Sequence, residues 1–272
     1  MIVIGSAYEH DCFDKFLNIK VKNIVELEYQ LKEIFGSAKD IYVCWMLTNN
    51  ITGDNFDVVN IGNICHKYGA YFICDLTASI GHCIIPNNLE EWCDCCCASA
   101  HKFYGEKNEG FLWIGNKLYK HLHSDIINNL VHGTVDVAGA LMLADAMEWV
   151  DGNYEDSHYN NLLTVLYNLL FEAGIEAHNI CLNEKTRSHA INAIYLPNIN
   201  ADALQTYLAS KDIYIGVAHS ACADSDDYRV LQAMGYSKDI ARQTIRVSFS
   251  VDTTVDDIKG FVNTVKNFKE MF

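Results

Sequence analysis

The chain has 272 residues, of which 50% are hydrophobic and 20% are charged, so it is long enough for one large domain or for a large and a smaller one. Its formal net charge of −15 opposes contact with phosphate backbones, and we expect no nucleic-acid partner. We also expect no signal peptide and no membrane span, because no basic start precedes a long apolar run and no apolar stretch reaches about 18 residues. Eleven cysteines in such a chain favour reduced thiols and a cytoplasmic protein.

Short apolar runs alternate with helical patterns in the first half of the chain. The spacing of apolar residues predicts helices over residues 24–34 and 58–69. Runs typical of buried strands occur at residues 2–4, 41–47, 70–74, 95–99 and 110–114. This order predicts an α/β fold with a mostly parallel sheet sandwiched by helices, because strands that are apolar throughout need both sheet faces covered.

The second half has a different pattern. Helical spacing dominates over residues 135–173, with a break at 151–153. The elements expected after it are strand 190–196, helix 201–210, strand 213–218, helix 228–234, strand 244–250 and a final amphipathic helix. We therefore predict two domains, a large one over residues 1–150 and a smaller α+β domain over residues 151–272.

The segment Ser-Ala-His-Lys-Phe-Tyr-Gly at residues 99–105 carries the clearest chemical signal. Lys102 follows a buried strand and is preceded by His101. A lysine at a strand end can have a partly desolvated amine, which is then a neutral nucleophile suited to hold pyridoxal 5′-phosphate (PLP) as a Schiff base. An isolated lysine in this position is in most proteins a surface residue at a strand–loop junction, so the interpretation depends on its neighbours.

Two polar residues upstream strengthen this interpretation. Asp75 ends an apolar strand, where a carboxylate can pair with a protonated pyridine nitrogen. Asn50 follows the preceding strand and can donate to a phenolic oxygen. The alternatives are a helix cap for Asp75 and a plain turn for Asn50, since asparagine and glycine favour turns.

Four pieces occur in a fixed order along the chain: Glu9-His10, Asn-Asn-Ile-Thr-Gly at 49–53, Asp75, and Ser-Ala-His-Lys at 99–102. Together they resemble the class V aminotransferase superfamily, and specifically the cysteine desulfurases, over almost the whole chain. The spacing from Asn50 to Asp75 fits that family without a gap, and the stretch from Asp75 to Lys102 needs a short insertion. The resemblance implies PLP fold type I, with the PLP-binding large domain in residues 1–150.

The resemblance also assigns roles around the cofactor. It implies that Lys102 holds PLP, that His10 stacks on the ring and relays protons, that Asp75 holds the ring nitrogen, and that Asn50 binds the phenolic oxygen and contacts the substrate. The phosphate contacts that it implies come from Ser99, His101 and Thr134. In the family, the threonine that Thr134 matches reaches the phosphate of the partner subunit, which implies a homodimer.

Arg246 and Cys222 set the reaction that the resemblance implies. Arg246 matches the arginine that binds the substrate carboxylate, where a bidentate guanidinium–carboxylate contact is expected. Cys222, in Ser-Ala-Cys at 220–222, matches the cysteine that accepts sulfur as a persulfide. The implied function is conversion of L-cysteine to L-alanine, with transfer of sulfur to a sulfur-acceptor protein. The alternatives for these two residues are a surface strand arginine and a small buried apolar residue.

The cluster Cys93, Cys95, Cys96 and Cys97 favours a core strand over a metal site. Neighbouring residues of a strand point to opposite faces, so Cys95 and Cys97 face one side and Cys96 the other. We therefore expect no metal ligands here, and cysteine serves as a small apolar residue.

Three departures from the family pattern bear on activity. The chain matches the family without its N-terminal part, which supplies a Gly-rich phosphate cradle, so we expect a separately encoded N-terminal segment to provide it. Ala78 stands where the family has a glutamine. The chain has Val-His-Gly-Thr at residues 131–134, where the family has an arginine followed by Ser-Gly-Thr.

Other functions stay open at this point. One is another class V activity, such as a selenocysteine lyase, an aminotransferase or an epimerase. Another is a degenerate or split subunit that acts as a binding partner. The sulfur acceptor is also open, and with it the choice between iron–sulfur cluster assembly and other uses of sulfur.

Overall fold

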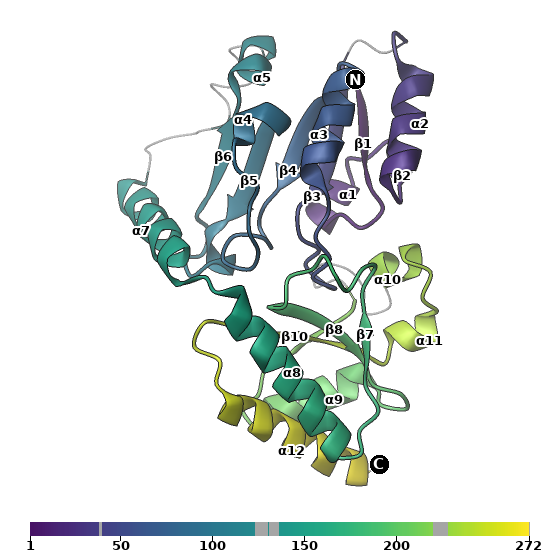
Figure 1. Cartoon of the computed structure of the whole chain (residues 1–272), viewed down its shortest axis with the longest axis vertical. Coiled ribbons are helices and arrows are strands. Elements are labelled where there is room, and N and C mark those ends of the chain that lie inside the picture. The colour runs from purple at the N-terminus through teal and green to yellow at the C-terminus, as the bar shows by residue number, and fades with distance from the viewer. Residues whose placement is uncertain (38–39, 123–129, 131–135, 220–227, 272) are drawn as a thin grey trace. The chain divides into compact units, whose positions relative to one another are not determined.

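The structure of the chain, a computed structural model, describes residues 1–37, 40–122, 130, 136–219 and 228–271. The chain forms two compact units (Figure 1). Unit 1 comprises Met1–Thr48 and Phe56–Tyr154, and unit 2 comprises Asn49–Asn55 and Glu155–Phe272. The short stretch Asn49–Asn55 thus belongs to unit 2, although the residues on both sides of it belong to unit 1. The assignment of residues 1–150 and 151–272 to two functional domains stays a prediction.

Unit 1 is built on a six-stranded sheet in the order β2-β1-β3-β4-β5-β6. The first five strands in this order run parallel, and β6 is antiparallel to β5. The strands are β1 (Ile2–Ser6), β2 (Ile19–Val21), β3 (Ile41–Met46), β4 (Tyr71–Asp75), β5 (Cys95–Ser99) and β6 (Gly110–Ile114). The mostly parallel sheet expected from the sequence is confirmed. Strand β2 was not predicted, because three residues give too short an apolar run.

One face of this sheet carries the main core of unit 1. Helices α2 (Ile24–Ile34), α3 (Val58–Lys67) and α4 (Leu89–Trp92) pack on it, and Figure 1 shows α2 and α3 running alongside the strands. Asn23 caps α2 by accepting from the Glu26 amide. The other helical segments of unit 1 are α1 (Asp11–Asp14), the 3₁₀ turn Ala100–Lys102, α5 (Asn116–His121) and α7 (Val137–Asn153).

The opposite face of the sheet is less covered by the described residues. Along β4, Phe72 and Cys74 are fully buried on the core side, whereas Tyr71 and Ile73 on the other side remain partly exposed. On β6, Leu112 is 49% exposed and is also on this second face, since it pairs with Cys97. Parallel sheets are normally covered on both faces, so this apolar, half-exposed surface bears on the function proposed below.

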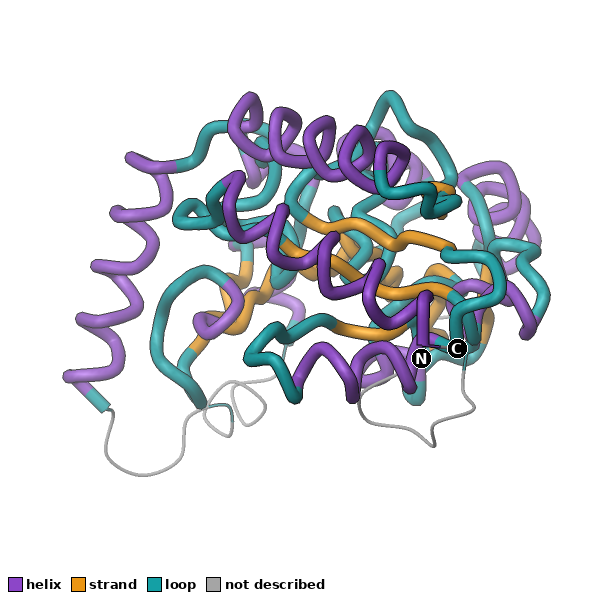
Figure 2. Tube along the Cα trace, turned by 90° about the horizontal axis from the view of Figure 1, so that it is seen from below, coloured by secondary structure: helices purple, strands orange, loops and turns teal. Residues whose placement is uncertain are grey.

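Unit 2 is built on a four-stranded antiparallel sheet in the order β7-β8-β10-β9. Figure 2 draws the strands of both sheets in orange and the helices in purple. The strands are β7 (His178–Ile180), β8 (Ile191–Tyr195), β9 (Gly216–Val217) and β10 (Thr244–Ser248). The helices are α8 (Asp156–Glu172), α9 (Ala201–Ala209), α10 (Arg229–Ala233), α11 (Lys238–Ala241) and α12 (Val255–Met271).

The final helix and its cap agree with the sequence. Its apolar stripe is buried, and Thr254 and Asp257 form the reciprocal pair of a capping box, in which the Thr254 amide donates to Asp257 and the Asp257 amide donates to Thr254. The strand expected over residues 213–218 is only the two-residue β9, because only Gly216 and Val217 find partners on β10. The expected helix break at 151–153 lies at Tyr154 instead, after α7 has run through Gly152.

No helix among the described residues combines the length and the apolar character needed to cross a membrane.

Candidate active site

The carboxyl ends of the parallel strands in unit 1 bring five predicted site residues to one edge of the sheet. His10 follows β1, Asp75 ends β4, and Ser99, His101 and Lys102 lie at the end of β5 or directly after it. In open parallel sheets this edge is where ligands bind, because successive strands present their following loops there. The order of these residues along the chain therefore becomes a cluster only through the parallel strand order.

His10 is held in place by a neighbour whose role the sequence did not reveal. Glu9 is fully buried, and its Oε1 accepts hydrogen bonds from Ser6 Oγ (2.6 Å) and from the Met46 amide (3.1 Å). Glu9 therefore ties the end of β1 to the end of β3 directly before His10. His10 begins α1, and its Nδ1 accepts from the Cys12 amide at 3.3 Å, which leaves the proton of a neutral ring on Nε2.

Asp75 is a buried carboxylate with one oxygen fixed by the backbone. Asp75 is only 7% exposed, and its Oδ1 accepts a hydrogen bond from the Thr77 amide at 2.8 Å. Burial raises the pKa of the thiols of Cys12 and Cys97, and the negative charge of Asp75 raises it further. These thiols therefore stay protonated near neutral pH.

Lys102 lies on a tight turn with an exposed side chain. The amides of Phe103 and Gly105 both donate to the Ala100 carbonyl at 2.9 Å, and Phe103 is fully buried beneath the turn. Tyr104 has a φ of 70°, a left-handed conformation that is uncommon for an aromatic residue and that sharpens the turn. The backbone of this turn is thereby fixed.

The neighbours of Lys102 form a polar group around its charge. Ser99 Oγ is hydrogen-bonded to His101 Nδ1 at 2.9 Å. Burial lowers the pKa of His101, and the charges of Lys102 and Lys107 lower it further, so this imidazole is neutral near pH 7. A hydroxyl and a neutral imidazole beside a lysine are suitable donors for a phosphate.

His82 was not predicted from the sequence, although it lies in the segment that follows β4. Burial lowers the pKa of His82 to about 4, and the positive charge of Lys102 contributes to the same shift. The imidazole is therefore neutral over the whole physiological range. A lone histidine after a strand has no sequence signal that would distinguish it.

The residues of unit 1 fit PLP. A buried carboxylate with one oxygen occupied and the other available suits a pyridinium nitrogen, and Lys102 on the same sheet edge suits the aldehyde carbon. Ser99 and His101 supply donors for the phosphate. Ala78, which is half-buried after β4, offers only a methyl group, so one expected hydrogen bond to the cofactor is missing from this set.

The other predicted residues that the structure describes, Asn50 and Arg246, both belong to unit 2. Arg246 Nη1 donates to the Asn50 carbonyl oxygen at 3.0 Å. The guanidinium packs closely on Gly216, where an added Cβ would lie 2.7 Å from Arg246 Nε. Burial lowers the pKa of Arg246 from an ordinary value so high that the group remains charged. The predicted residues Thr134 and Cys222 lie outside the described residues.

The cysteine-rich strand is part of the core, as expected. Cys93, Cys95 and Cys96 are buried, and burial raises the pKa of Cys95 to about 12. In the described ranges, no group of three or more His, Cys, Asp or Glu side chains is placed to hold a metal ion.

Comparison with known proteins identifies the family. A model of the class-V aminotransferase family matches residues 15–261, and the chain belongs to this family. Enzymes of this family depend on PLP, and the mostly parallel sheet flanked by helices, with a second antiparallel sheet, is the fold type I arrangement.

Among curated proteins, the chain is 29% identical over 262 residues to a cysteine desulfurase IscS of Buchnera aphidicola subsp. Schizaphis graminum, covering 92% of this chain and 62% of that protein. It is 30% identical over 238 residues to a cysteine desulfurase IscS of Clostridium botulinum (strain Kyoto / Type A2), covering 80% and 56%. A solved NifS-like protein from Rickettsia africae has a TM-score of 0.79 at 23% identity, covering 99% of this chain and 76% of that chain. The chain thus spans about 60% of the length of the curated relatives it matches.

Proposed function

We propose that this chain is the main part of a PLP-dependent cysteine desulfurase, which converts L-cysteine to L-alanine and passes the sulfur to a cysteine of its own. The observation that carries the proposal is the placement of Lys102 on a rigid turn after β5, at the same sheet edge as the buried carboxylate of Asp75. The names of the similar curated proteins support the choice of reaction within the family.

The chain's own residues have separate tasks in this reaction. PLP, when bound, supplies an electron sink that stabilises negative charge on the substrate carbon. Asp75 holds the ring nitrogen, Ser99 and His101 hold the phosphate, and Thr134 of a partner subunit adds a further phosphate contact. Arg246 binds the carboxylate of L-cysteine through its guanidinium fork, and Asn50 orients the cofactor oxygen and the substrate.

Proton and sulfur transfer complete the set. His10 has its Nδ1 occupied by a backbone amide, so its Nε2 is the atom that moves protons. The Cys222 thiolate attacks the sulfur of the substrate, the carbon–sulfur bond breaks, and a persulfide forms on Cys222. The substrate carbon takes up a proton, which gives L-alanine, and the persulfide sulfur then passes to an acceptor protein.

Two variants test the proposal. Lys102→Ala should abolish the visible absorbance that PLP acquires on binding this chain, whereas Lys107→Ala, a change in an exposed lysine of the same loop, should not. Cys222→Ala should abolish persulfide formation from L-cysteine, whereas Cys12→Ala should retain it. A wild-type protein that forms no persulfide, and whose amino-acid turnover is unchanged in Cys222→Ala, would favour a selenocysteine lyase, aminotransferase or epimerase instead.

The second face of the unit 1 sheet suggests that a further polypeptide segment packs on it. The half-exposed sheet face with Tyr71, Ile73 and Leu112 is apolar, and β6 is an edge strand with one side unpaired by the described strands. We propose that a further polypeptide segment, corresponding to the N-terminal part of the relatives, covers this surface and contributes to the phosphate site. A chain that binds PLP and turns over L-cysteine fully without it would contradict this part of the proposal, and a chain inert in both states would favour a degenerate binding subunit.

The proposed enzyme is a homodimer. Helix α7 exposes large apolar side chains, among them Leu141 (62%), Met142 (43%) and Trp149 (41%), which is costly for a monomer in water. Light scattering on the purified protein should give the dimer mass. The many buried free thiols of the described residues support a reducing compartment, and we propose a cytoplasmic enzyme with iron–sulfur cluster assembly as the use of the sulfur.

A further inference from the structure

The stretch Asn49–Asn55, which carries Asn50, is tied to unit 2 by its backbone. The Ser188 amide donates to the Gly53 carbonyl at 2.8 Å, and the Asn55 amide donates to the Thr186 carbonyl at 3.0 Å. Gly53 has a φ of 75°, and a Cβ there would collide with the Ile191 carbonyl oxygen. This stretch therefore lies in close backbone contact with the chain that leads into β8.

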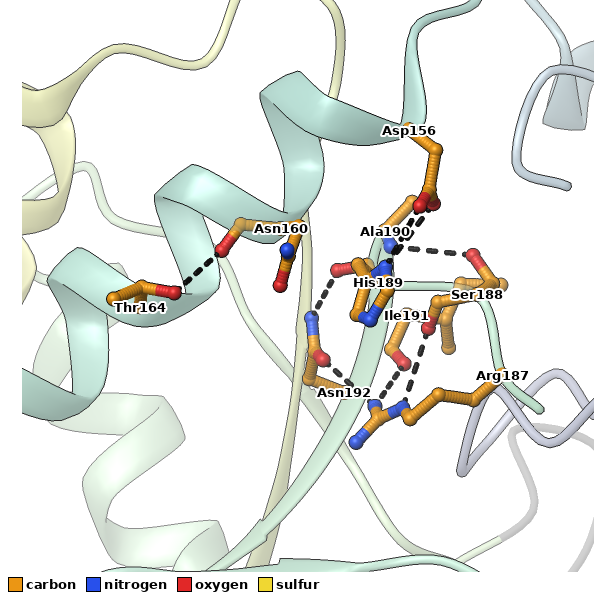
Figure 3. A network of polar contacts seen from close by, with 9 residues as sticks. All are labelled: Asp156, Asn160, Thr164, Arg187, Ser188, His189, Ala190, Ile191 and Asn192. Carbon is orange, nitrogen blue, oxygen red and sulfur yellow. Dashed lines mark hydrogen bonds and ion pairs between the residues drawn. The ribbon is translucent and has the colours of Figure 1, made fainter. Parts of the chain in front are cut away.

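Arg187 is a charged residue that donates hydrogen bonds to both of these segments. The residue is only 7% exposed, yet it carries a guanidinium. Nη2 donates to the Thr52 carbonyl (3.3 Å), to the Ile191 carbonyl (2.9 Å) and to Asn192 Oδ1 (2.7 Å), and Nε donates to the Ser188 carbonyl (3.4 Å). Figure 3 shows the guanidinium directed at Ile191 and Asn192. Arg187 thus joins the Asn49–Asn55 stretch to β8.

The acceptors of Arg187 are themselves held. Asn192 Nδ2 donates to the His189 carbonyl at 2.9 Å, and His189 Nδ1 lies 3.1 and 3.2 Å from the two carboxylate oxygens of Asp156 at the start of α8 (Figure 3). The Ala190 amide donates to Ser188 Oγ at 3.1 Å. Several of the oxygens that accept from the guanidinium are therefore fixed by other contacts. The guanidinium is held in one orientation by them and donates from that orientation to the Thr52 carbonyl.

Thr52 lies two residues after Asn50, and the carbonyl of Asn50 accepts from Arg246 Nη1 at 3.0 Å. We propose that Arg187 is a positioning residue of the active site, because it fixes the Asn49–Asn55 stretch and thereby holds both Asn50 and the Arg246 guanidinium in place. The roles of Asn50 and Arg246 in this inference rest on the proposed function. Asp54 of the same stretch is buried; burial raises the pKa of its carboxyl, and the charge of Arg187 lowers that pKa by less. A buried ion gains little stability over an apolar residue, so a geometric role accounts better for a guanidinium whose hydrogen bonds go to oxygens of two segments.

Amide hydrogen exchange on the purified full chain tests the positioning without any need for activity. Arg187→Met removes all donors, and Arg187→Lys keeps the charge but not the fork. Both should speed exchange in peptides covering residues 49–55 by about tenfold or more, while α12 stays protected. Arg242→Met, in which an exposed arginine of the same unit is changed, should leave these peptides as in the wild type.

Two outcomes would overturn the positioning role. One is wild-type protection of residues 49–55 in Arg187→Lys. The other is loss of protection throughout unit 2 in both variants, which would make Arg187 a general stabiliser.

Kinetics with the PLP-loaded protein give the second readout. Arg187→Lys should raise the KM for L-cysteine about tenfold with a smaller change in kcat, because carboxylate binding by Arg246 loosens while Lys102 is untouched. Faster exchange at residues 49–55 with an unchanged KM would refute the link to Arg246. A wild-type protein that lacks desulfurase activity even when it is supplied with the N-terminal part of a relative would refute the proposed function, and the exchange result would still decide whether Arg187 orders this stretch.

Discussion

At the scale of single residues, the proposed chemistry depends on residues that orient the side chains of His10 and Arg246. Glu9 fixes the turn before His10 with two hydrogen bonds, and the Asn50 carbonyl anchors one nitrogen of Arg246. Gly216 gives the same guanidinium its space. None of these three contacts involves a reacting atom, yet each constrains the direction of a group that we assign to cofactor or substrate.

Gly216→Ala should weaken substrate binding. The added methyl group would lie 2.7 Å from Arg246 Nε, so the guanidinium must move away from its present place. We expect the KM for L-cysteine to rise about tenfold with a smaller loss of kcat. Gly260→Ala on α12 is the matched control, because a Cβ there meets open space. Equal kinetics for the two variants would show that Arg246 tolerates the methyl group.

His82 should make the stability of the chain depend on pH. Its pKa is lowered to about 4 in the fold, so the unfolded chain binds more protons between that pH and the ordinary pKa of histidine. Stability is therefore fully present above the ordinary pKa and is lost as the pH falls toward about 4.

We expect His82 to account for a loss of about 2 kcal/mol in the free energy of unfolding between about pH 7 and about pH 5. Urea unfolding at the two pH values measures this. His82→Gln should remove that part of the slope, whereas His178→Gln, in which an exposed histidine is changed, should retain it. The same slope in both variants would contradict the burial of a neutral His82.

At the scale of elements, the buried apolar face of a helix determines how much that helix contributes to the stability of its unit. Helix α8 buries one side only: Leu162, Leu166 and Leu170 are no more than 2% exposed, while Phe171 is 84% exposed. Their spacing of four residues is one helical face, which packs within unit 2.

Leu166→Ala should therefore lower the free energy of unfolding by about 2–5 kcal/mol, because it leaves a cavity in a closed core. Phe171→Ala on the same helix should change it by no more than about 0.5 kcal/mol, since that ring is already in water. Chemical denaturation of both variants provides the comparison. A small loss for Leu166→Ala would mean that the core of unit 2 can collapse around the gap.

At the scale of the whole molecule, the main structural feature is that the described residues leave one face of the unit 1 sheet partly exposed. Leu112→Glu should leave the stability of the chain almost unchanged, within about 0.5 kcal/mol, because Leu112 is exposed. It should, however, weaken binding of a covering segment. Pull-down with the part of the Buchnera relative that this chain does not match measures this, with Leu112→Val as the control. Equal capture by both variants would place the covering segment elsewhere.

Local pattern was sufficient to predict much of the fold and to choose candidate site residues. The apolar runs at 41–47, 70–74 and 95–99 correspond to β3, β4 and β5, and the stripe of α12 was correct. Lys102 and Asp75 were identified from their positions at strand ends. These features depend on residues close together in the chain, where periodicity and capping leave a clear signal.

Long-range packing was needed for the rest. The sequence did not indicate that Asn49–Asn55 belongs with unit 2, that Arg187 holds it, or that Gly216 makes room for Arg246. The first two depend on segments more than a hundred residues apart, and the third depends on the pairing of Gly216 on β9 with Arg246 on β10. The neutral state of His82 likewise results from burial among distant residues, and burial is a property of the folded chain alone. Lys102 was thus visible as a chemical group in the sequence, whereas the contacts that order its surroundings arise only when the strands and loops come together.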